Sequence, residues 1–131
     1  MNPLVRGLSL LCALAWAGLI YYLSSQPSID ITPVFEHQDK LLHLAAYAVL
    51  GFFGMGAMQV STSGYRVSQL LMVATLTGLY GLLDEYHQSF VPGRNASVLD
   101  VLADCTGAML GAGLAFLLVR WLAYRSSGVT V

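Results

Sequence analysis

Polar and charged side chains gather in one short stretch of an otherwise apolar sequence. Residues 84–111 read DEYHQSFVPGRNASVLDVLADCTGAMLG and combine acids and amides with one arginine and one histidine. A second stretch, DKLLH at residues 39–43, adds an acid, a lysine and another histidine. Because charge is costly in an apolar chain, we expect the two stretches to form one polar site.

Anion binding is one chemistry that these residue types favour. Arg94 follows Pro92 and Gly93 in a tight turn, and a guanidinium binds phosphate or carboxylate through paired hydrogen bonds. Lys40 and His43, one helical turn apart, would add a second cation and a proton donor or acceptor. The candidate ligand-binding residues are Lys40, Tyr47, Gln88, Arg94, Asp100 and Asp104.

Acid–base chemistry and metal binding are two further uses of the same residues. His43, Asp84 and Glu85 are the candidate catalytic acids and bases. A divalent cation could be held by carboxylate oxygens, and the candidate ligands are Asp84, Glu85, Asp100 and Asp104. Their spacing matches no recognised metal signature, and no HExxH, P-loop, GxSxG or Rossmann motif occurs.

Structural roles compete with these functional ones. Asp39 and Asp100 fall near helix N-termini, where a negative charge is stabilising. A capping role alone therefore explains each of them as well as a functional role does. Asp104 lies one turn too deep for capping and should need a partner such as Lys40, His43 or Arg94. That pair is either a structural ion pair or part of a ligand or metal site, and intramembrane ionisable residues favour the second.

Apolar segments of membrane-spanning length must position this site. The chain has 131 residues, 56% of them hydrophobic and 10% charged, with a mean hydropathy of +0.67. These values predict an all-α membrane protein, a four-transmembrane-helix bundle in a single domain over residues 1–131. The predicted helices cover residues 3–23, 39–59, 67–89 and 98–122.

The first apolar segment, residues 3–23, has a signal peptide as its competing interpretation because Arg6 precedes the apolar run. The run ends in YYLSSQP without a small-residue cleavage site, so we expect a retained helix that packs outside the others and has no polar partner. Cys12 and Cys105 lie in apolar runs, which favours small buried residues over a disulfide.

Local signals mark the helix ends. Asp39 and Ser97 are the expected N-caps of the second and fourth helices, with Asp100 completing a capping box after Ser97. Pro92 and Gly93 predict a type II turn, in which Gly93 supplies the positive φ. Gly107 and Gly111 form a small-xxx-small pattern that serves packing within the chain or a dimer.

Charge distribution predicts the topology. With four alternating spans, one side holds four arginines and no acid, and the other holds all seven acids, all three histidines, Lys40 and Arg94. The excess of positive charge places the first side, with both termini, in the cytoplasm and the polar site on the outer face. A net charge of −1 argues against nucleic-acid binding.

The polar residues also carry a family resemblance. The chain resembles the VanZ-like small bacterial membrane proteins in Asp39-Lys40-x-x-His43-x-x-x-Tyr47-x-x-x-Gly51, in Asp84-Glu85-x-x-Gln88-x-Phe90-x-Pro92-Gly93-Arg94, and in Asp100 with Gly107-x-x-x-Gly111. The resemblance covers roughly residues 39–113, and the family often has Asn at the position of Asp104. It implies a multi-helix membrane fold and, for the family's namesake, low-level resistance to the glycopeptide teicoplanin.

Three functions follow as hypotheses. The first is an outer-face pocket for an anionic envelope lipid, either a phospholipid headgroup or a polyprenyl phosphate, with a divalent cation as an optional cofactor. Whether the site catalyses a reaction is open, and hydrolysis or transfer at a phosphate or acyl group would suit its residues. The second is a non-enzymatic accessory protein whose charged cluster is a salt-bridged lock, and the third is a small transporter.

Overall fold

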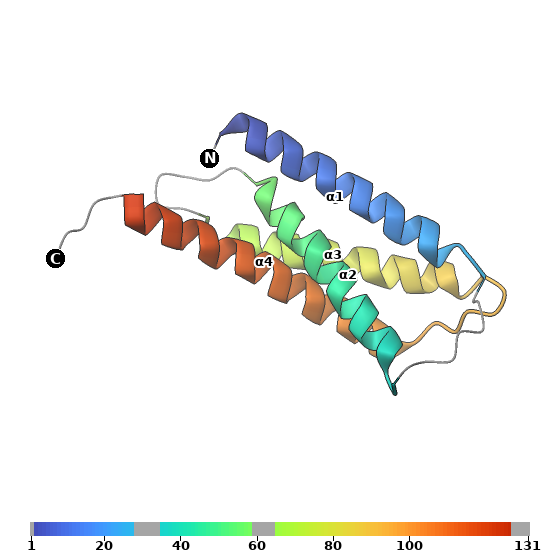
Figure 1. Cartoon of the computed structure of the whole chain (residues 1–131). Coiled ribbons are helices and arrows are strands. Elements are labelled where there is room, and N and C mark those ends of the chain that lie inside the picture. Colours follow the sequence, from blue (N-terminus) through green and yellow to red (C-terminus); the bar gives the residue numbers. More distant parts are fainter. Residues whose placement is uncertain (1, 28–34, 59–64, 127–131) are drawn as a thin grey trace.

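Four α-helices make up the computed structural model, which describes residues 2–27, 35–58 and 65–126. They are α1 (Pro3–Ser24), α2 (Gln38–Gly56), α3 (Val67–Gln88) and α4 (Val98–Ser126). Consecutive helices run in alternating directions, so α1 begins and α4 ends at the same end of the molecule (Figure 1). The all-α prediction is confirmed, although α2 ends before the predicted limit, residue 59, which lies outside the described residues.

Apolar side chains cover the outside of the molecule. Helices α1, α3 and α4 are long and apolar enough to cross a membrane, whereas α2 is less apolar and carries Asp39, Lys40 and His43. Large leucines on every helix are more than half exposed, while alanines of α4 are fully buried. Exposed apolar faces around a core rich in small residues are typical of helices that pack within lipid.

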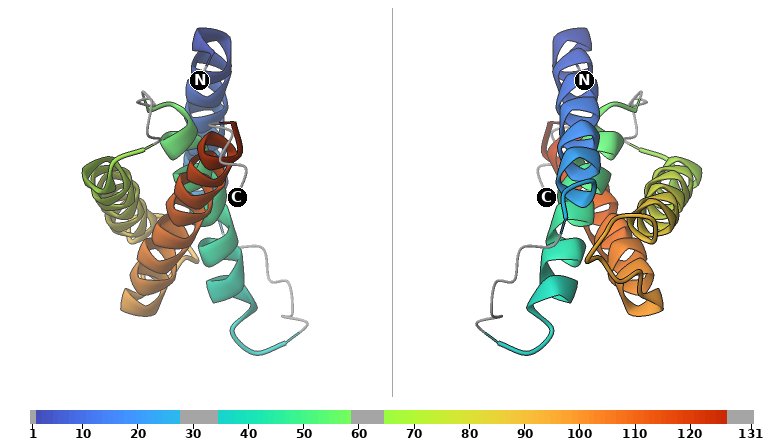
Figure 2. Two further views of the ribbon diagram at one scale, coloured as in Figure 1. Left: turned by 90° about the vertical axis from the view of Figure 1, so that its left-hand side faces the viewer. Right: turned by 90° about the vertical axis from the view of Figure 1, so that its right-hand side faces the viewer.

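The closest helix contact is between α2 and α4, which cross in the middle of the molecule (Figure 2). A Cβ atom on Gly107 would overlap the carbonyl oxygen of Leu44, and one on Gly111 would overlap that of Ala48. Gly51 of α2 lies equally close to the Ala108 carbonyl of α4. The small-xxx-small pattern therefore packs two helices of one chain against each other.

Helix α1 packs against α2 and α3 and makes no contact with α4 in the described part of the chain. The Trp16 indole N–H donates to the Ala46 carbonyl of α2 at 2.9 Å, and the Tyr80 hydroxyl of α3 donates to the Ala17 carbonyl at 2.7 Å. The prediction that the first helix lacks polar partners is wrong, because it donates to α2 through Trp16 and accepts from Tyr80 of α3.

The turn before α4 follows its prediction. Gly93 has a φ of 77°, and the Arg94 N–H donates to the Val91 carbonyl at 3.1 Å. The Ser97 hydroxyl caps α4 by accepting from the Leu99 N–H at 3.2 Å. The predicted capping box is wrong, since the Ser97 N–H donates to Glu85 at 2.9 Å instead.

Two other local predictions are also corrected. Asp39 is not an N-cap, because α2 begins at Gln38 and His37 occupies the cap position with a φ of 63°. Cys12 and Cys105 are free, as expected, but both lie exposed rather than buried. Their position on outward faces agrees with the apolar exterior of the helices.

Candidate functional site

Three helices bring one histidine and two acids together inside the molecule. His43 of α2 places its Nδ1 3.0 Å from Oδ1 of Asp104 on α4 and 3.7 Å from Oε1 of Glu85 on α3. Asp104 is 0% exposed and Glu85 is 3% exposed. Gly81 makes room for Asp104, since a Cβ at Gly81 would lie 2.6 Å from the Asp104 Cβ. The prediction that Asp104 has a partner such as Lys40, His43 or Arg94 is confirmed, and that partner is His43.

Lys40 forms ion pairs with two acids at the outer rim of the cluster. Its Nζ lies 2.7 Å from Asp100 and 2.8 Å from Asp39. Asp100 is 5% exposed, and its pair with Lys40 joins the first turn of α2 to the first turn of α4. Two carboxylates neutralise this lysine, so the geometry favours a structural role for Lys40 and Asp100.

Asp84 is satisfied by neutral donors. The Ser24 hydroxyl donates to Oδ1 at 2.6 Å, and the Gln88 amide donates to Oδ2 at 3.0 Å. All three residues are 5% exposed. Sequence reasoning missed Ser24, whose only signal is its position as the first polar residue after a long apolar run.

Arg94 holds the end of α1. Its Nη2 donates to the Leu23 carbonyl at 2.8 Å and its Nε to the Gln26 carbonyl at 3.1 Å. These bonds tie the turn before α4 to the last turn of α1 and to the residues just after it, where the Leu23 carbonyl also accepts from the Gln26 N–H at 3.2 Å. No carboxylate in the described ranges forms an ion pair with this guanidinium, which keeps its positive charge available.

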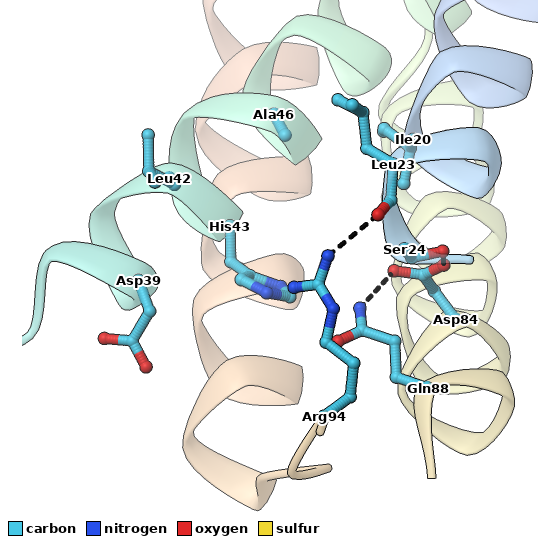
Figure 3. A pocket seen from close by; sticks show the side chains of 10 residues that line it. All are labelled: Ile20, Leu23, Ser24, Asp39, Leu42, His43, Ala46, Asp84, Gln88 and Arg94. Carbon is cyan, nitrogen blue, oxygen red and sulfur yellow. Dashed lines mark hydrogen bonds between the residues drawn. The ribbon is translucent and has the colours of Figure 1, made fainter. Parts of the chain in front are cut away.

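A cavity of about 240 Å³ lies beside Arg94 (Figure 3). It is lined by Ile20, Leu23, Ser24, Asp39, Leu42, His43, Ala46, Asp84, Gln88 and Arg94. In Figure 3, His43, Asp84 and Gln88 lie around the Arg94 guanidinium, Ile20, Leu23 and Ala46 lie above it, and Asp39 and Leu42 lie farther away on α2. The cavity therefore has one charged end and one apolar side.

The location of this cavity corrects the predicted one. The sequence places a pocket between the second, third and fourth helices, whereas the structure places the cavity between α1, α2, α3 and Arg94. Gly107 and Gly111 bring α4 close to α2, and Gly81 brings it close to α3. Of the candidate site residues, His43, Asp84, Gln88 and Arg94 line the cavity, and Lys40, Tyr47, Glu85, Asp100 and Asp104 do not.

The predicted metal ligands separate into different environments. Oxygens of Glu85 and Asp104 and a ring nitrogen of His43 all lie within 4.8 Å of one another. Asp84 and Asp100 are bonded to other partners, as described above. Tyr47 is 1% exposed beside Tyr80, and among the described residues its hydroxyl has no hydrogen-bond partner.

Comparison with known proteins places this arrangement in a family. The sequence model of the family described as VanZ/LLP1 matches residues 9–120. The chain belongs to the VanZ/LLP1 family. The match confirms the resemblance found in the sequence and extends it into α1, so that it includes every residue of the site. No curated protein and no solved structure matches this VanZ-family chain.

Proposed function

We propose that this VanZ-family chain spans the cytoplasmic membrane four times and binds an anionic lipid headgroup in the cavity beside Arg94. The observation that carries the proposal is the division of that cavity into a charged end and an apolar wall. A lipid has the same two parts, and ligand pockets commonly combine an apolar lining with a few placed polar groups that fix orientation. Phospholipids and polyprenyl phosphates share the phosphate that Arg94 would bind.

The residues around Arg94 suit a phosphate with hydroxyl groups nearby. The guanidinium forms no ion pair with any acid in the residues described, and the His43 ring lies on the same cavity wall. Asp39 and Gln88 would bind hydroxyl groups of the ligand. A volume of about 240 Å³ is smaller than the roughly 300–1,000 Å³ of drug-sized sites, so it fits a headgroup rather than a whole lipid.

The first helix is an essential part of this proposal. Ser24 and Leu23 of α1 line the cavity and bind Asp84 and Arg94, so a chain without α1 would have an incomplete site. We therefore infer that α1 is retained as a span. Positive-inside reasoning then places both termini in the cytoplasm and the cavity at the outer face.

Catalysis would be an extension of binding. The His43 ring lines the cavity while its Nδ1 faces Asp104, which is how a carboxylate orients a catalytic imidazole. Hydrolysis or transfer at a phosphate or acyl group is the reaction class that this placement suits. Binding of an envelope lipid would also connect the chain to the teicoplanin resistance that the resemblance implies.

A structural lock is the second candidate function, favoured by two specific contacts. Lys40 is neutralised by Asp39 and Asp100, and Arg94 donates to backbone carbonyls of α1. Both contacts tie helix ends together without any ligand. On this account the chain is an envelope accessory protein that acts through partners.

Native mass spectrometry of the detergent-purified protein distinguishes the two candidates. We expect wild type to retain a phosphate-bearing lipid, Arg94→Ala to lose it, and the matched control Arg120→Ala, which is exposed on α4, to retain it. Lipid extraction from the same samples identifies the headgroup. A wild type with no bound lipid, together with an Arg94→Ala variant that unfolds at a lower temperature, would support the lock and contradict lipid binding.

A further inference from the structure

Three buried polar atoms have no hydrogen-bond partner in the described structure. They are the Tyr47 hydroxyl, Oε1 of Glu85 and Oδ2 of Asp104, on side chains that are 1%, 3% and 0% exposed. Leaving a buried polar group unpaired costs about 1–3 kcal/mol, and more for a charged group. Atoms of this kind indicate a ligand such as an ion or water that satisfies them.

Charge balance around these atoms points to a cation. Glu85 and Asp104 both contact His43, and no other cationic side chain in the described ranges pairs with either acid. Even a protonated His43 would leave one excess negative charge on the three residues. Buried excess charge is strongly destabilising, whereas a divalent cation with a neutral imidazole would balance two carboxylates.

The spacing of the three side chains suits metal coordination. Metal–ligand bonds of about 2.0–2.2 Å place neighbouring ligand atoms roughly 2.8–3.6 Å apart in tetrahedral or octahedral sites. The Nδ1 of His43 lies 3.0 Å from Oδ1 of Asp104 and 3.7 Å from Oε1 of Glu85. All three ligand atoms lie within 4.8 Å of one another, so the side chains would have to draw closer together for all three atoms to bind one ion.

We propose that His43, Glu85 and Asp104 bind one divalent transition-metal ion between α2, α3 and α4. The imidazole nitrogen favours ions such as Zn²⁺ over Mg²⁺ and Ca²⁺, and the two carboxylates also suit Mn²⁺, which serves as the spectroscopic probe. His43 also lines the cavity beside Arg94, which gives the ion a route from the surface. Asp104 supplies the second anionic ligand of this site.

Metal binding does not depend on the lipid proposal. The ion lies among α2, α3 and α4, whereas the headgroup cavity lies among α1, α2, α3 and Arg94, with His43 common to both. Either site can therefore be tested while the other fails. The metal experiment below measures bound metal directly and needs no added lipid.

The test is titration of chelator-stripped, detergent-purified protein with Mn²⁺, followed by electron paramagnetic resonance, with Zn²⁺ as competitor. We expect one equivalent of bound Mn²⁺ in wild type, displaced by Zn²⁺. Asp104→Asn removes a direct metal ligand. Loss of a residue that only hydrogen-bonds to a ligand lowers metal affinity roughly 10–100-fold, so this variant should lower it by at least that factor. The charge-matched control Glu36→Gln removes an exposed acid and should bind like wild type.

A second measurement on wild type alone covers the case in which Asp104→Asn fails to fold. Pulsed resonance of the Mn²⁺-loaded protein should show coupling to one imidazole nitrogen, from His43. Absence of Mn²⁺ binding to stripped wild type, an all-oxygen coordination shell, or equal affinity in a folded Asp104→Asn variant would each overturn the proposal.

Discussion

The seam between α2 and α4 and the attachment of α1 are built in opposite ways. In the seam, Gly51, Gly107 and Gly111 bring two backbones into contact, and the polar pairs Lys40–Asp100 and His43–Asp104 lie nearer the N-terminal ends of the same two helices. By contrast, α1 is held by donors that reach its backbone from outside, namely the Tyr80 hydroxyl and the Arg94 guanidinium. The glycine part of the first interface depends on shape, whereas the attachment of α1 depends on hydrogen bonds.

This difference separates the rigid part of the molecule from the part that borders the cavity. The glycine contacts leave no space between the helices, because any added side chain would overlap a carbonyl group. Side-chain hydrogen bonds between membrane helices contribute only about 0.6–1.7 kcal/mol each. We therefore expect α2, α3 and α4 to hold the buried acids in place, while α1 forms the more easily displaced wall of the cavity.

The largest effect should come from filling the seam. Gly111→Leu should destabilise the protein by at least about 3 kcal/mol, at the upper end of overpacking effects, because its side chain would overlap the Ala48 backbone. Thermal unfolding in detergent measures the loss. Gly113→Leu is the matched control, since a Cβ at Gly113 has no atom within 4 Å. Equal unfolding temperatures for the two variants would show that the seam is not tightly packed.

A smaller effect should follow when one bond to α1 is removed. Tyr80→Phe deletes the hydroxyl that donates to the Ala17 carbonyl and should cost about 0.6–1.7 kcal/mol. The control is Tyr86→Phe, in which the deleted hydroxyl belongs to a 66% exposed ring. Limited proteolysis of α1 reports the same change. A Tyr80→Phe variant as destabilised as Gly111→Leu would remove the contrast between the two interfaces.

Much of the rigid part could be predicted from the sequence because its signals are local. The spacing of Gly107 and Gly111 indicates a close helix contact, and Pro92 with Gly93 specifies a turn. Asp104 is an acid deep in an apolar helix, so it requires a partner, and His43 is that partner. The lengths of the apolar runs likewise indicate the helix bounds approximately, because hydrophobicity is a property of the local sequence.

The attachment of α1 could not be predicted in the same way. Tyr80 and Arg94 bind backbone carbonyls on another helix, and any residue type offers such a carbonyl. Their partners depend on crossing angles and on how far each helix is shifted along its axis. The capping box expected between Ser97 and Asp100 failed for a related reason, since the Ser97 N–H donates to Glu85 of another helix instead.

Calorimetric titration with a matched pair of lipids tests most directly whether the polar end of the molecule binds a lipid phosphate. A short-chain phosphatidic acid carries the phosphate, and the corresponding diacylglycerol lacks it. We predict that wild type binds only the first, and that Arg94→Ala weakens this binding at least about tenfold, because hydrogen bonds to charged groups contribute roughly 1.5–3 kcal/mol. Equal affinity for the two lipids, or no binding of either, would contradict the account.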